Sequence, residues 1–310
     1  MVFKRYLDRS LRENRVSAKT TEHLHDSAAG LDQRPPAEIA ALLASGQVAA
    51  AENVQKAIPA ICAGAMAMAR TINAGACLHY AAAGSSGLMA AADAQELGGT
   101  FSIPAAQLRI HVAGGLPSGV EMPGDTEDAT DGLATALAEL SEKDTLITVS
   151  ASGSTPFTIA AARIGKSKGA TVIGIANNAG SELLDMSDHA VLLETPPEVL
   201  SGSTRMGAGT AQKIALNMLS TLMATHLGHV HDGMMVNVNA DNIKLRARAC
   251  GIVVQIAGVS EATAQQALDA AGGDVKAAVL MAATGLSRDI AQARLKESNG
   301  HLRPVLERTV

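Results

Sequence analysis

Three short segments rich in glycine, serine and threonine have the composition of anion-binding loops: AAAGSSG at 81–87, SASGSTP at 150–156 and SGSTRMGAGT at 201–210. Each is predicted to lead into a helix, whose first backbone N–H groups have no partner within the helix and attract negative charge. Glycine lets the backbone approach a ligand, and hydroxyl groups bind phosphate oxygens. The candidate ligand-binding residues are Gly84, Ser85, Ser86, Ser152, Ser154, Thr155, Ser203, Thr204 and Arg205.

One loop of this kind gives weak support for a ligand, because serine is also an ordinary helix N-cap. Three such loops in one chain are more specific. None of them contains the GxxxxGK[ST] pattern of a nucleotide-binding P-loop or the GxGxxG pattern of a dinucleotide-binding fold. The sequence therefore indicates a phosphate-binding site that differs from these two nucleotide-binding motifs.

Two glutamates are candidates for acid–base chemistry. Glu96 stands near the end of the helix predicted after the first loop, and Glu127 stands beside Asp128 in a segment rich in glycine and proline. By itself, each would be interpreted as a solvated surface carboxylate.

The HVHD sequence at 229–232 resembles a metal-ligand cluster, but no third His or Cys lies nearby, so no metal site is predicted. His79, within a predicted strand, is expected in the core or at an interface.

Strands and helices alternate in the middle of the chain. Apolar runs predict strands at 77–84, 108–115, 144–153, 171–177 and 189–195, and helices are predicted at 88–97, 131–140, 155–168 and 204–227. This alternation predicts an α/β fold with a doubly wound parallel sheet, covered by helices on both faces. Ligands bind such sheets at the carboxyl ends of the strands, where the first two loops are expected.

The flanking regions are predicted to be helical. One helix is expected from Pro36 to Gly46 and a long one at 48–72. Beyond residue 239, Gly258, Gly272-Gly273 and Gly285 separate three short helices, a pattern similar to the ubiquitin-associated fold. The predicted organisation is a flexible N-terminus at 1–20, an α/β domain at 21–239 and a helical module at 240–310.

Composition narrows the functional class. The chain has 310 residues, a net charge of −5 and no tryptophan, which argues against a nucleic-acid partner. The N-terminus has no apolar signal-peptide core, and no apolar run reaches transmembrane length, so no membrane partner is expected. Cys62, Cys77 and Cys250 are far apart, which predicts a reducing compartment and no structural zinc. The expected location is the cytoplasm.

Taken together, the motifs resemble those of the N-acetylmuramic acid 6-phosphate etherases and of the related glucokinase regulatory protein, both in the sugar isomerase superfamily. The etherases carry GAGTSGR and then a helix ending in DA-S-E or DA-A-E, and this chain carries AAGSSGL and DAQE between 82 and 96. AGG at 113–115 precedes TED at 126–128, as an acidic motif does in the family. Further similar segments are ASGSTP, the stretch 202–213, LNMLST, MVNV and GGDVK, so the resemblance covers nearly the whole chain.

This resemblance implies a sugar isomerase-type phosphosugar-binding fold with a C-terminal helical lid, and a homodimer that acts on a small phosphosugar. It implies that Glu96 matches the essential acid–base carboxylate and Glu127 a second active-site glutamate. The implied reaction cleaves the D-lactyl ether of N-acetylmuramic acid 6-phosphate to N-acetylglucosamine 6-phosphate and D-lactate, and it needs no metal or redox cofactor. Because one carboxyl group must hold a proton near neutral pH, Glu96 is expected to be desolvated.

Three cations of the family motifs are replaced. The etherases carry arginine where this chain has Leu88 and Ser154, and lysine where it has Gly207. Each lost charge-assisted hydrogen bond would cost about 1.5–3 kcal/mol if it touched the ligand. The replacements reflect either neutral changes at surface or subunit contacts, or a different amino-sugar phosphate.

Two alternatives to the etherase remain open. An aldose–ketose phosphosugar isomerase also needs a carboxylate base beside an opened sugar. A non-enzymatic sugar-phosphate-binding regulator needs the ligand site but not Glu96. Replacement of Glu96 by alanine would stop turnover in both enzymes and leave the regulator intact.

Overall fold

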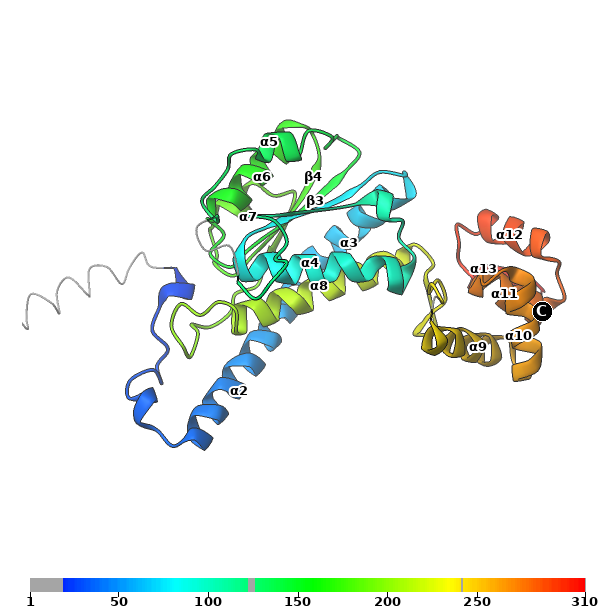
Figure 1. The fold of residues 1–310 in the computed structure, drawn as a ribbon, viewed down its shortest axis with the longest axis horizontal. Coiled ribbons are helices and arrows are strands. Elements are labelled where there is room, and N and C mark those ends of the chain that lie inside the picture. Colours follow the sequence, from blue (N-terminus) through cyan, green and yellow to red (C-terminus); the bar gives the residue numbers. More distant parts are fainter. Residues whose placement is uncertain (1–18, 122–125, 241, 310) are drawn as a thin grey trace, which may run out of the picture. The chain divides into compact units, whose positions relative to one another are not determined.

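The computed structural model describes residues 19–121, 126–240 and 242–309, and Figure 1 shows the order of the elements along the chain. The chain forms two compact units. The first contains the described part of Met1–Gly64 with His79–Ala91 and Ile110–Asn217, and the second contains Ala65–Leu78, Ala92–Arg109 and Met218–Val310. Each unit is built from separate stretches of sequence, and the division falls within individual strands and helices.

Five strands form one sheet in the order β2-β1-β3-β4-β5. The bounds are β1 Leu78–Ala82, β2 Leu108–Val112, β3 Thr145–Ser150, β4 Thr171–Ala176 and β5 His189–Leu192. β3, β4 and β5 pair in parallel. The N–H of Ala113 donates to the carbonyl of Ala82 at 3.1 Å, so β1 and β2 end at the same edge. β1 and β3 are buried along their whole length, as expected for strands covered on both faces.

Helices cover the sheet, which confirms the doubly wound prediction. Their bounds are α2 Pro36–Asn53, α3 Ile58–Asn73, α4 Gly84–Phe101, α5 Leu133–Ala136, α6 Pro156–Ser167, α7 Glu182–Met186 and α8 Gly207–His226. On one face, Leu137, Phe157 and Leu183 pack into a buried cluster with Leu146 of β3. Figure 1 shows α8 on the other side of the sheet. There Gln212 of α8 donates to the side-chain oxygen of Asn177, just past β4, at 3.0 Å.

The predicted helix ends are wrong in three places. α2 continues through Gly46 to Asn53, and a β-carbon at Gly46 would lie 3.1 Å from Val199, so this glycine serves close packing. The single helix predicted at 48–72 is interrupted by a 3-10 turn at Val54–Ala57 before α3 begins. Pro59 explains this break, because proline has no N–H and is tolerated only in the first turn of a helix. The helix predicted at 131–140 shortens to α5.

The C-terminal part of the second unit is helical. After the short pair β6 Val230–His231 and β7 Met234–Met235, the helices are α9 Ile243–Ala257, α10 Glu261–Ala271, α11 Val275–Thr284, α12 Arg288–Glu297 and α13 Arg303–Thr309. Gly258, Gly272 and Gly285 end α9, α10 and α11 in the left-handed conformation that favours glycine. α12 and α13 add to the three helices predicted from sequence. The ubiquitin-associated likeness and the boundary at 239/240 stay predictions.

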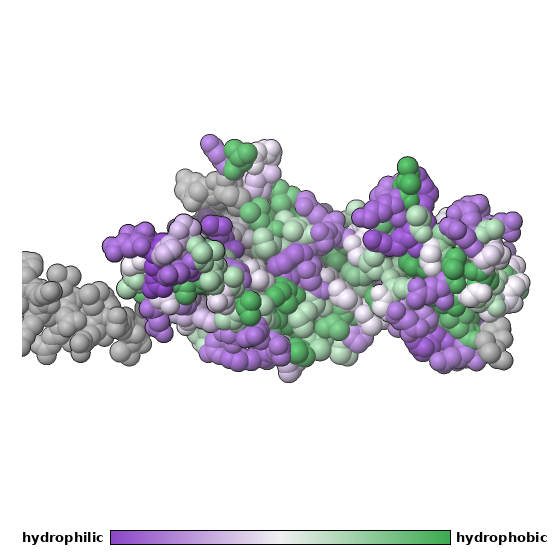
Figure 2. All heavy atoms as spheres, turned by 90° about the horizontal axis from the view of Figure 1, so that it is seen from below, coloured by the Kyte–Doolittle hydropathy of each residue, from purple (hydrophilic) through white to green (hydrophobic). Residues whose placement is uncertain are grey.

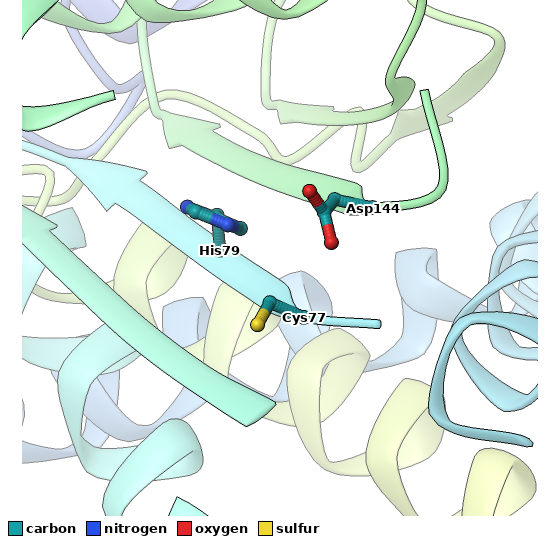
Figure 3. A group of neighbouring side chains, drawn as sticks. All are labelled: Cys77, His79 and Asp144. Atoms are coloured by element: carbon teal, nitrogen blue, oxygen red, sulfur yellow. The ribbon is translucent and has the colours of Figure 1, made fainter. Parts of the chain in front are cut away.

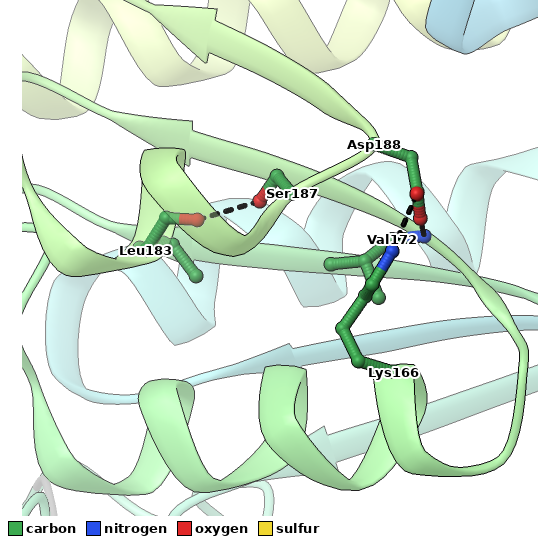
Figure 4. Close-up of polar contacts among 5 residues, drawn as sticks. All are labelled: Lys166, Val172, Leu183, Ser187 and Asp188. Carbon is green, nitrogen blue, oxygen red and sulfur yellow. Dashed lines mark hydrogen bonds and ion pairs between the residues drawn. The ribbon is translucent and has the colours of Figure 1, made fainter.

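A polar cluster in the first unit fixes the start of β5 (Figure 4). Asp188 accepts a hydrogen bond from the ammonium group of Lys166 in α6 and another, at 2.8 Å, from the N–H of Val172 in β4. Burial alone would raise the pKa of Asp188, but the bonds from Lys166 and Val172 lower it overall. Ser187 donates to the carbonyl of Leu183 at 2.6 Å. These bonds tie α6, α7 and two strands together at the edge of the sheet.

Several large apolar side chains are exposed. Val48 on α2, Ile58 on α3 and Leu88 on α4 are 58%, 43% and 38% exposed. Figure 2 shows apolar side chains between hydrophilic ones on the side seen from below. Single exposed apolar residues are normal on a protein surface. Among the described residues, no helix has the length and apolar character needed to cross a membrane.

Candidate functional site

The first two candidate loops lie where the strand order reverses. From β1 the chain moves outward to β2, and it then returns to β3 on the other side of β1. The loop after β1 leads into α4, and the loop after β3 leads into α6. Both loops therefore stand at the carboxyl ends of the strands that flank this switch point. Open α/β sheets bind their ligands in the crevice at such a point.

Glu127 lies against the start of α4. Its Oε1 would be 2.1 Å from a β-carbon built on Gly84, the first residue of that helix. Gly84 also has a φ of +53°, in the left-handed region that favours glycine. Ser85, partly exposed, and Ser86, 9% exposed, follow in the same helical turn. The structure therefore brings a carboxylate to the helix start that carries the first-loop candidates.

The backbone of Glu127 reaches the second helix start. Its carbonyl accepts a hydrogen bond at 3.1 Å from the N–H of Phe157, the second residue of α6. That N–H belongs to the first turn of α6, where no partner exists within the helix. One residue thus contacts the starts of both helices that follow β1 and β3, so Glu127 lies at the switch point of the sheet.

The second loop is a cluster of hydroxyl groups. The Oγ of Ser150 lies 2.8 Å from the Oγ1 of Thr155 and 3.3 Å from the Oγ of Ser152. The hydroxyl of Ser154 donates to that of Ser152 at 3.2 Å. Gly153 between them has a φ of +67°, and a β-carbon there would lie 2.3 Å from the Oγ of Ser181. The structure therefore brings the three second-loop candidates together around a required glycine.

A lysine from the N-terminal segment contacts this loop. Lys19 donates from its ammonium group to the hydroxyl of Ser154. Nearby, the N–H of Thr21 donates to Oδ1 of Asn178 at 3.3 Å. Nδ2 of Asn178 donates to Oγ1 of Thr21 at 3.1 Å and to the carbonyl of Ser152 at 3.3 Å. Asn178 is only 4% exposed, so it fixes the segment that carries Lys19. A cation thus stands beside Ser154, where the etherase motif has arginine.

The third segment does not present the unpaired helix start that the sequence predicts. Glu198, 6% exposed, accepts hydrogen bonds from the N–H groups of Gly207 at 2.9 Å and Ala208 at 2.8 Å, in the first turn of α8. A carboxylate is favourable there because the helix N-terminus carries partial positive charge. Since Glu198 occupies the position that the prediction gave to a ligand anion, that prediction is wrong.

Ser203, Thr204 and Arg205 lie in the turns before α8. The two hydroxyl residues are partly exposed and Arg205 is exposed. Within the described part of the chain, none of their side chains is hydrogen-bonded to the first two loops. Gly207 fits tightly, because a β-carbon on it would lie 3.1 Å from Oε2 of Glu198. The glycine that replaces a family lysine therefore belongs to the capped helix start.

Glu96 lies in α4, twelve residues beyond Gly84. At 1.5 Å per residue this is about 18 Å along the helix axis. Its side chain is exposed, so the expected desolvation is wrong for the single chain. A carboxylate this far along the same helix does not reach a ligand held at the first turn of α4.

The histidines of the HVHD sequence belong to the second unit. Nε2 of His231 lies 3.6 Å from Oδ2 of Asp232, and Asp232 is also paired with Arg303. Burial, and next the charge of Lys276, lower the pKa of His229 to about 4. His229 is therefore neutral at physiological pH, and Asp232 is engaged by an arginine. These contacts indicate a structural cluster.

Lys276 is itself a buried cation, 8% exposed. Its ammonium group donates to the carbonyls of Gly300 at 3.2 Å and Gly228 at 3.5 Å. Burial lowers the pKa of Lys276, while nearby Asp274 opposes that change. The lysine thus joins the turn after α8 to the turn between α12 and α13 in the second unit.

Sequence reasoning missed Lys19, Asn178 and Glu198. Lys19 lies at the end of a segment interpreted as flexible, where nothing in the local pattern predicts a contact. Asn177-Asn178 directly follow β4, and two amides after a buried strand could have indicated a polar role at the carboxyl edge. Glu198 stands nine residues before the helix that it caps, beyond the spacing of a local capping motif.

Comparisons with known proteins identify the family. Residues 120–227 match the family described as the SIS domain. An N-acetylmuramic acid 6-phosphate etherase from Deinococcus radiodurans is 42% identical over 291 residues, which cover 93% of this chain and 95% of that protein. A protein of the same name from Streptomyces avermitilis is 38% identical over 93% of each chain. The chain belongs to the N-acetylmuramic acid 6-phosphate etherase family.

Membership of the etherase family confirms the resemblance carried by the motifs. A solved phosphoheptose isomerase from Francisella tularensis has a TM-score of 0.44 at 18% identity, over 61% of this chain and 97% of that chain. In this etherase-family protein, the matched SIS region includes Glu127, the second loop and the third segment. The first loop and Glu96 lie outside that region, and the alignments with the etherases, which cover 93% of the chain, extend beyond it.

Proposed function

We propose that this protein cleaves the D-lactyl ether of N-acetylmuramic acid 6-phosphate in amino-sugar recycling, and that it does so in the cytoplasm. Similarity over nearly the whole chain to proteins named for that activity supports the proposal. The observation that carries it is the carboxylate of Glu127, which lies against Gly84 at the switch point of the sheet. A carboxylate beside phosphate-binding loops is what elimination from a phosphosugar requires. The three separated cysteines favour a reducing compartment.

The phosphate group of the substrate binds at the second loop. Ser152, Ser154 and Thr155 present clustered hydroxyl groups, and Lys19 supplies positive charge beside Ser154. Charge-assisted hydrogen bonds to phosphate are about twice as strong as neutral ones. Lys19 therefore compensates for the arginine that the family carries at the position of Ser154.

The reaction is an elimination followed by hydration. Opening of the sugar ring exposes an aldehyde at C1, which acidifies the proton on C2. A carboxylate removes that proton as general base, the C3–O bond breaks, and D-lactate leaves with a proton from a carboxylic acid. Water then adds at C3 of the unsaturated aldehyde to give N-acetylglucosamine 6-phosphate. Glu96 and Glu127 are the two carboxyl groups that we assign to these proton transfers.

Glu96 enters the site from a second copy of the chain. Within one chain it is exposed and about 18 Å along α4 from Gly84, whereas the chemistry needs it beside the sugar. Exposed Val48, Ile58 and Leu88 offer apolar surface for a subunit contact. In a two-fold symmetric homodimer, each subunit would supply Glu96 to its partner's site.

The first experiment is D-lactate release from N-acetylmuramic acid 6-phosphate by the purified protein. Glu96→Ala and Glu127→Ala are each expected to abolish release while phosphosugar binding persists. If the folded wild-type protein releases no D-lactate, the proposed etherase activity is wrong. Formation of a ketose phosphate would identify an isomerase, and binding without any turnover would identify a regulator.

Co-expression of the two variants tests the shared site. In a dimer of Glu96→Ala with Glu127→Ala, one site would hold both glutamates and the other neither. Random pairing should therefore restore about a quarter of the wild-type activity. If both glutamates act within one chain, co-expression restores no D-lactate release, and the proposal that Glu96 acts in the partner's site is wrong.

A further inference from the structure

The GGDVK segment at 272–276, which takes no part in the proposed reaction, lines a pocket in the second unit. The pocket has a volume of about 700 Å³, and its other walls include the segment between β7 and α9 and side chains of α12. All of its lining residues belong to the stretches 92–109 and 218–310, so the division between the two units does not cross it. The pocket can therefore be described within one unit.

The pocket combines buried apolar side chains with exposed polar ones. Val238, Val275 and Leu295 line it and belong to the buried core of the C-terminal helices. Asn239 and Gln292 line it as exposed residues, and their amide groups can donate to ligand oxygens. Sites for small molecules have this composition, with apolar walls and a few polar groups that fix the ligand.

Lys276 brings a buried positive charge to this pocket. It is 8% exposed, and its ammonium group donates to the carbonyls of Gly300 at 3.2 Å and Gly228 at 3.5 Å. Both distances exceed the usual value of about 2.9 Å for an N–H···O hydrogen bond. Among the described residues, no carboxylate forms an ion pair with Lys276, and Asp274 acts on it only through its electric field. Because a buried charge is costly unless it is paired, the ammonium group would be stabilised by an anionic partner.

Two buried carboxylates of the first unit have closer partners. Asp144 lies just before β3 (Figure 3), and its Oδ2 accepts hydrogen bonds from the N–H of Ser141 at 2.7 Å and from its hydroxyl at 2.8 Å. Glu198 accepts hydrogen bonds at 2.9 Å and 2.8 Å from two N–H groups at the start of α8. The bonds of Lys276 are longer, and the pocket beside it offers the space in which a closer anionic partner can bind.

We propose that the pocket binds a small monocarboxylate, whose carboxylate group pairs with the ammonium group of Lys276. Lys296 on α12 adds a second, exposed cation, whereas Asp274 adds one negative charge. Two positive charges and one negative charge leave a net charge of +1 around the pocket, which a single carboxylate neutralises. Asp274 would repel the higher charge of a phosphate group more strongly. The start of α11 is not part of the site, because Asp274 already accepts a hydrogen bond from the N–H of Ala277 at 3.0 Å.

The test titrates the full-length protein with D-lactate, acetate and inorganic phosphate in a calorimeter. D-lactate and acetate should bind, and Lys276→Met should weaken both by at least about tenfold, the equivalent of one charge-assisted hydrogen bond. Lys296→Met, at the exposed cation, should weaken both by a smaller factor. Phosphate binding should be unchanged in Lys276→Met. The control is Lys168→Met, because Lys168 also donates to a backbone carbonyl, that of Ala138, but lies in the first unit. It should bind both carboxylates as the wild type does.

His229 gives an independent readout in the wild type. Burial, and next the charge of Lys276, lower the pKa of His229 to about 4, so a carboxylate bound to Lys276 should raise that pKa. NMR at pH 5 should show a larger protonated fraction of His229 in saturating D-lactate than in chloride at the same concentration.

Three results would each contradict the proposed carboxylate site. Neither carboxylate binds, or Lys276→Met binds both as the wild type does, or only phosphate binding is lost in that variant. Lys276 then only joins two turns of the second unit, or pairs with a phosphate. Should Lys276→Met fail to fold, the response of His229 to D-lactate decides: an unchanged protonated fraction means that the proposal is wrong.

Discussion

The carboxylate of Glu127 excludes every side chain from position 84: its Oε1 lies 2.1 Å from where a β-carbon on Gly84 would stand. The two residues are far apart in the sequence, yet the helix start after β1 is shaped around this glutamate. Glu127 reaches α6 through its carbonyl and α4 through its carboxylate, so its position depends on both helix starts.

Gly84→Ala should therefore damage the site. The added methyl group would displace the carboxylate, and a shift of about 1 Å at a catalytic group costs about 100-fold in rate. We expect kcat/KM for D-lactate release to fall by about 100-fold. Gly75→Ala is the matched control, because Gly75 has a φ of +73° with nothing within 4 Å of an added β-carbon. Equal losses in the two variants would mean that backbone strain, and not Glu127, is responsible.

Lys19 should contribute to phosphate binding. Lys19→Met removes the ammonium group beside Ser154, and we expect KM to rise by about tenfold, the equivalent of one charge-assisted hydrogen bond discounted for its exposure. Lys19→Arg should keep most of the affinity. Because the contact is electrostatic, the wild-type KM should rise with salt more steeply than that of Lys19→Met. An unchanged KM in Lys19→Met would mean that Lys19 does not contribute to phosphate binding.

The sheet and its two loops could be predicted from sequence because their signals are local. Apolar strand runs, Ser/Gly turns and helix starts recur in a regular order, and each predicted strand is found. The contacts that shape the site are not local. The cap of α8 by Glu198 and the approach of Lys19 to Ser154 depend on how the chain folds back on itself. Gly46 shows the same limit, since its close packing against Val199 overrides its tendency to end a helix.

Glu198 should be a stability residue. Its carboxylate accepts hydrogen bonds from two backbone N–H groups, one on each oxygen, in a buried setting. Glu198→Gln replaces one oxygen by an NH2 group, so one N–H keeps only a neutral acceptor and the other loses its acceptor. We expect the free energy of unfolding to fall by about 1.5–3 kcal/mol, measured by urea denaturation. Glu194→Gln is the control, because the Glu194 side chain is 56% exposed. Its Oε2 lies 3.8 Å from Nζ of Lys56, and a surface ion pair of this kind contributes little to stability. A loss in Glu198→Gln no larger than in Glu194→Gln would contradict the capping role.

His229 should make the protein acid-sensitive. Its pKa is about 4 in the folded state and 6.5 ordinarily, so between these values the unfolded state binds more protons. The stability that it contributes is complete above about pH 6.5 and is lost as the pH falls toward 4. Between pH 7 and pH 5 we expect a loss of about 2 kcal/mol in the wild type and a smaller one in His229→Gln. A loss of the same size in His229→Gln as in the wild type would contradict this role of His229.

The interleaving of the two compact units has a consequence for synthesis on the ribosome. The first unit needs residues up to Asn217, and the second combines Ala65–Leu78 with the C-terminal helices. Early segments of the second unit therefore emerge long before the residues that they pack against, so neither unit completes its core until late in translation. Domains usually fold as they emerge, N-terminal first. In this chain a prematurely truncated product would expose apolar surface from both units at once and become a substrate for chaperones and proteases.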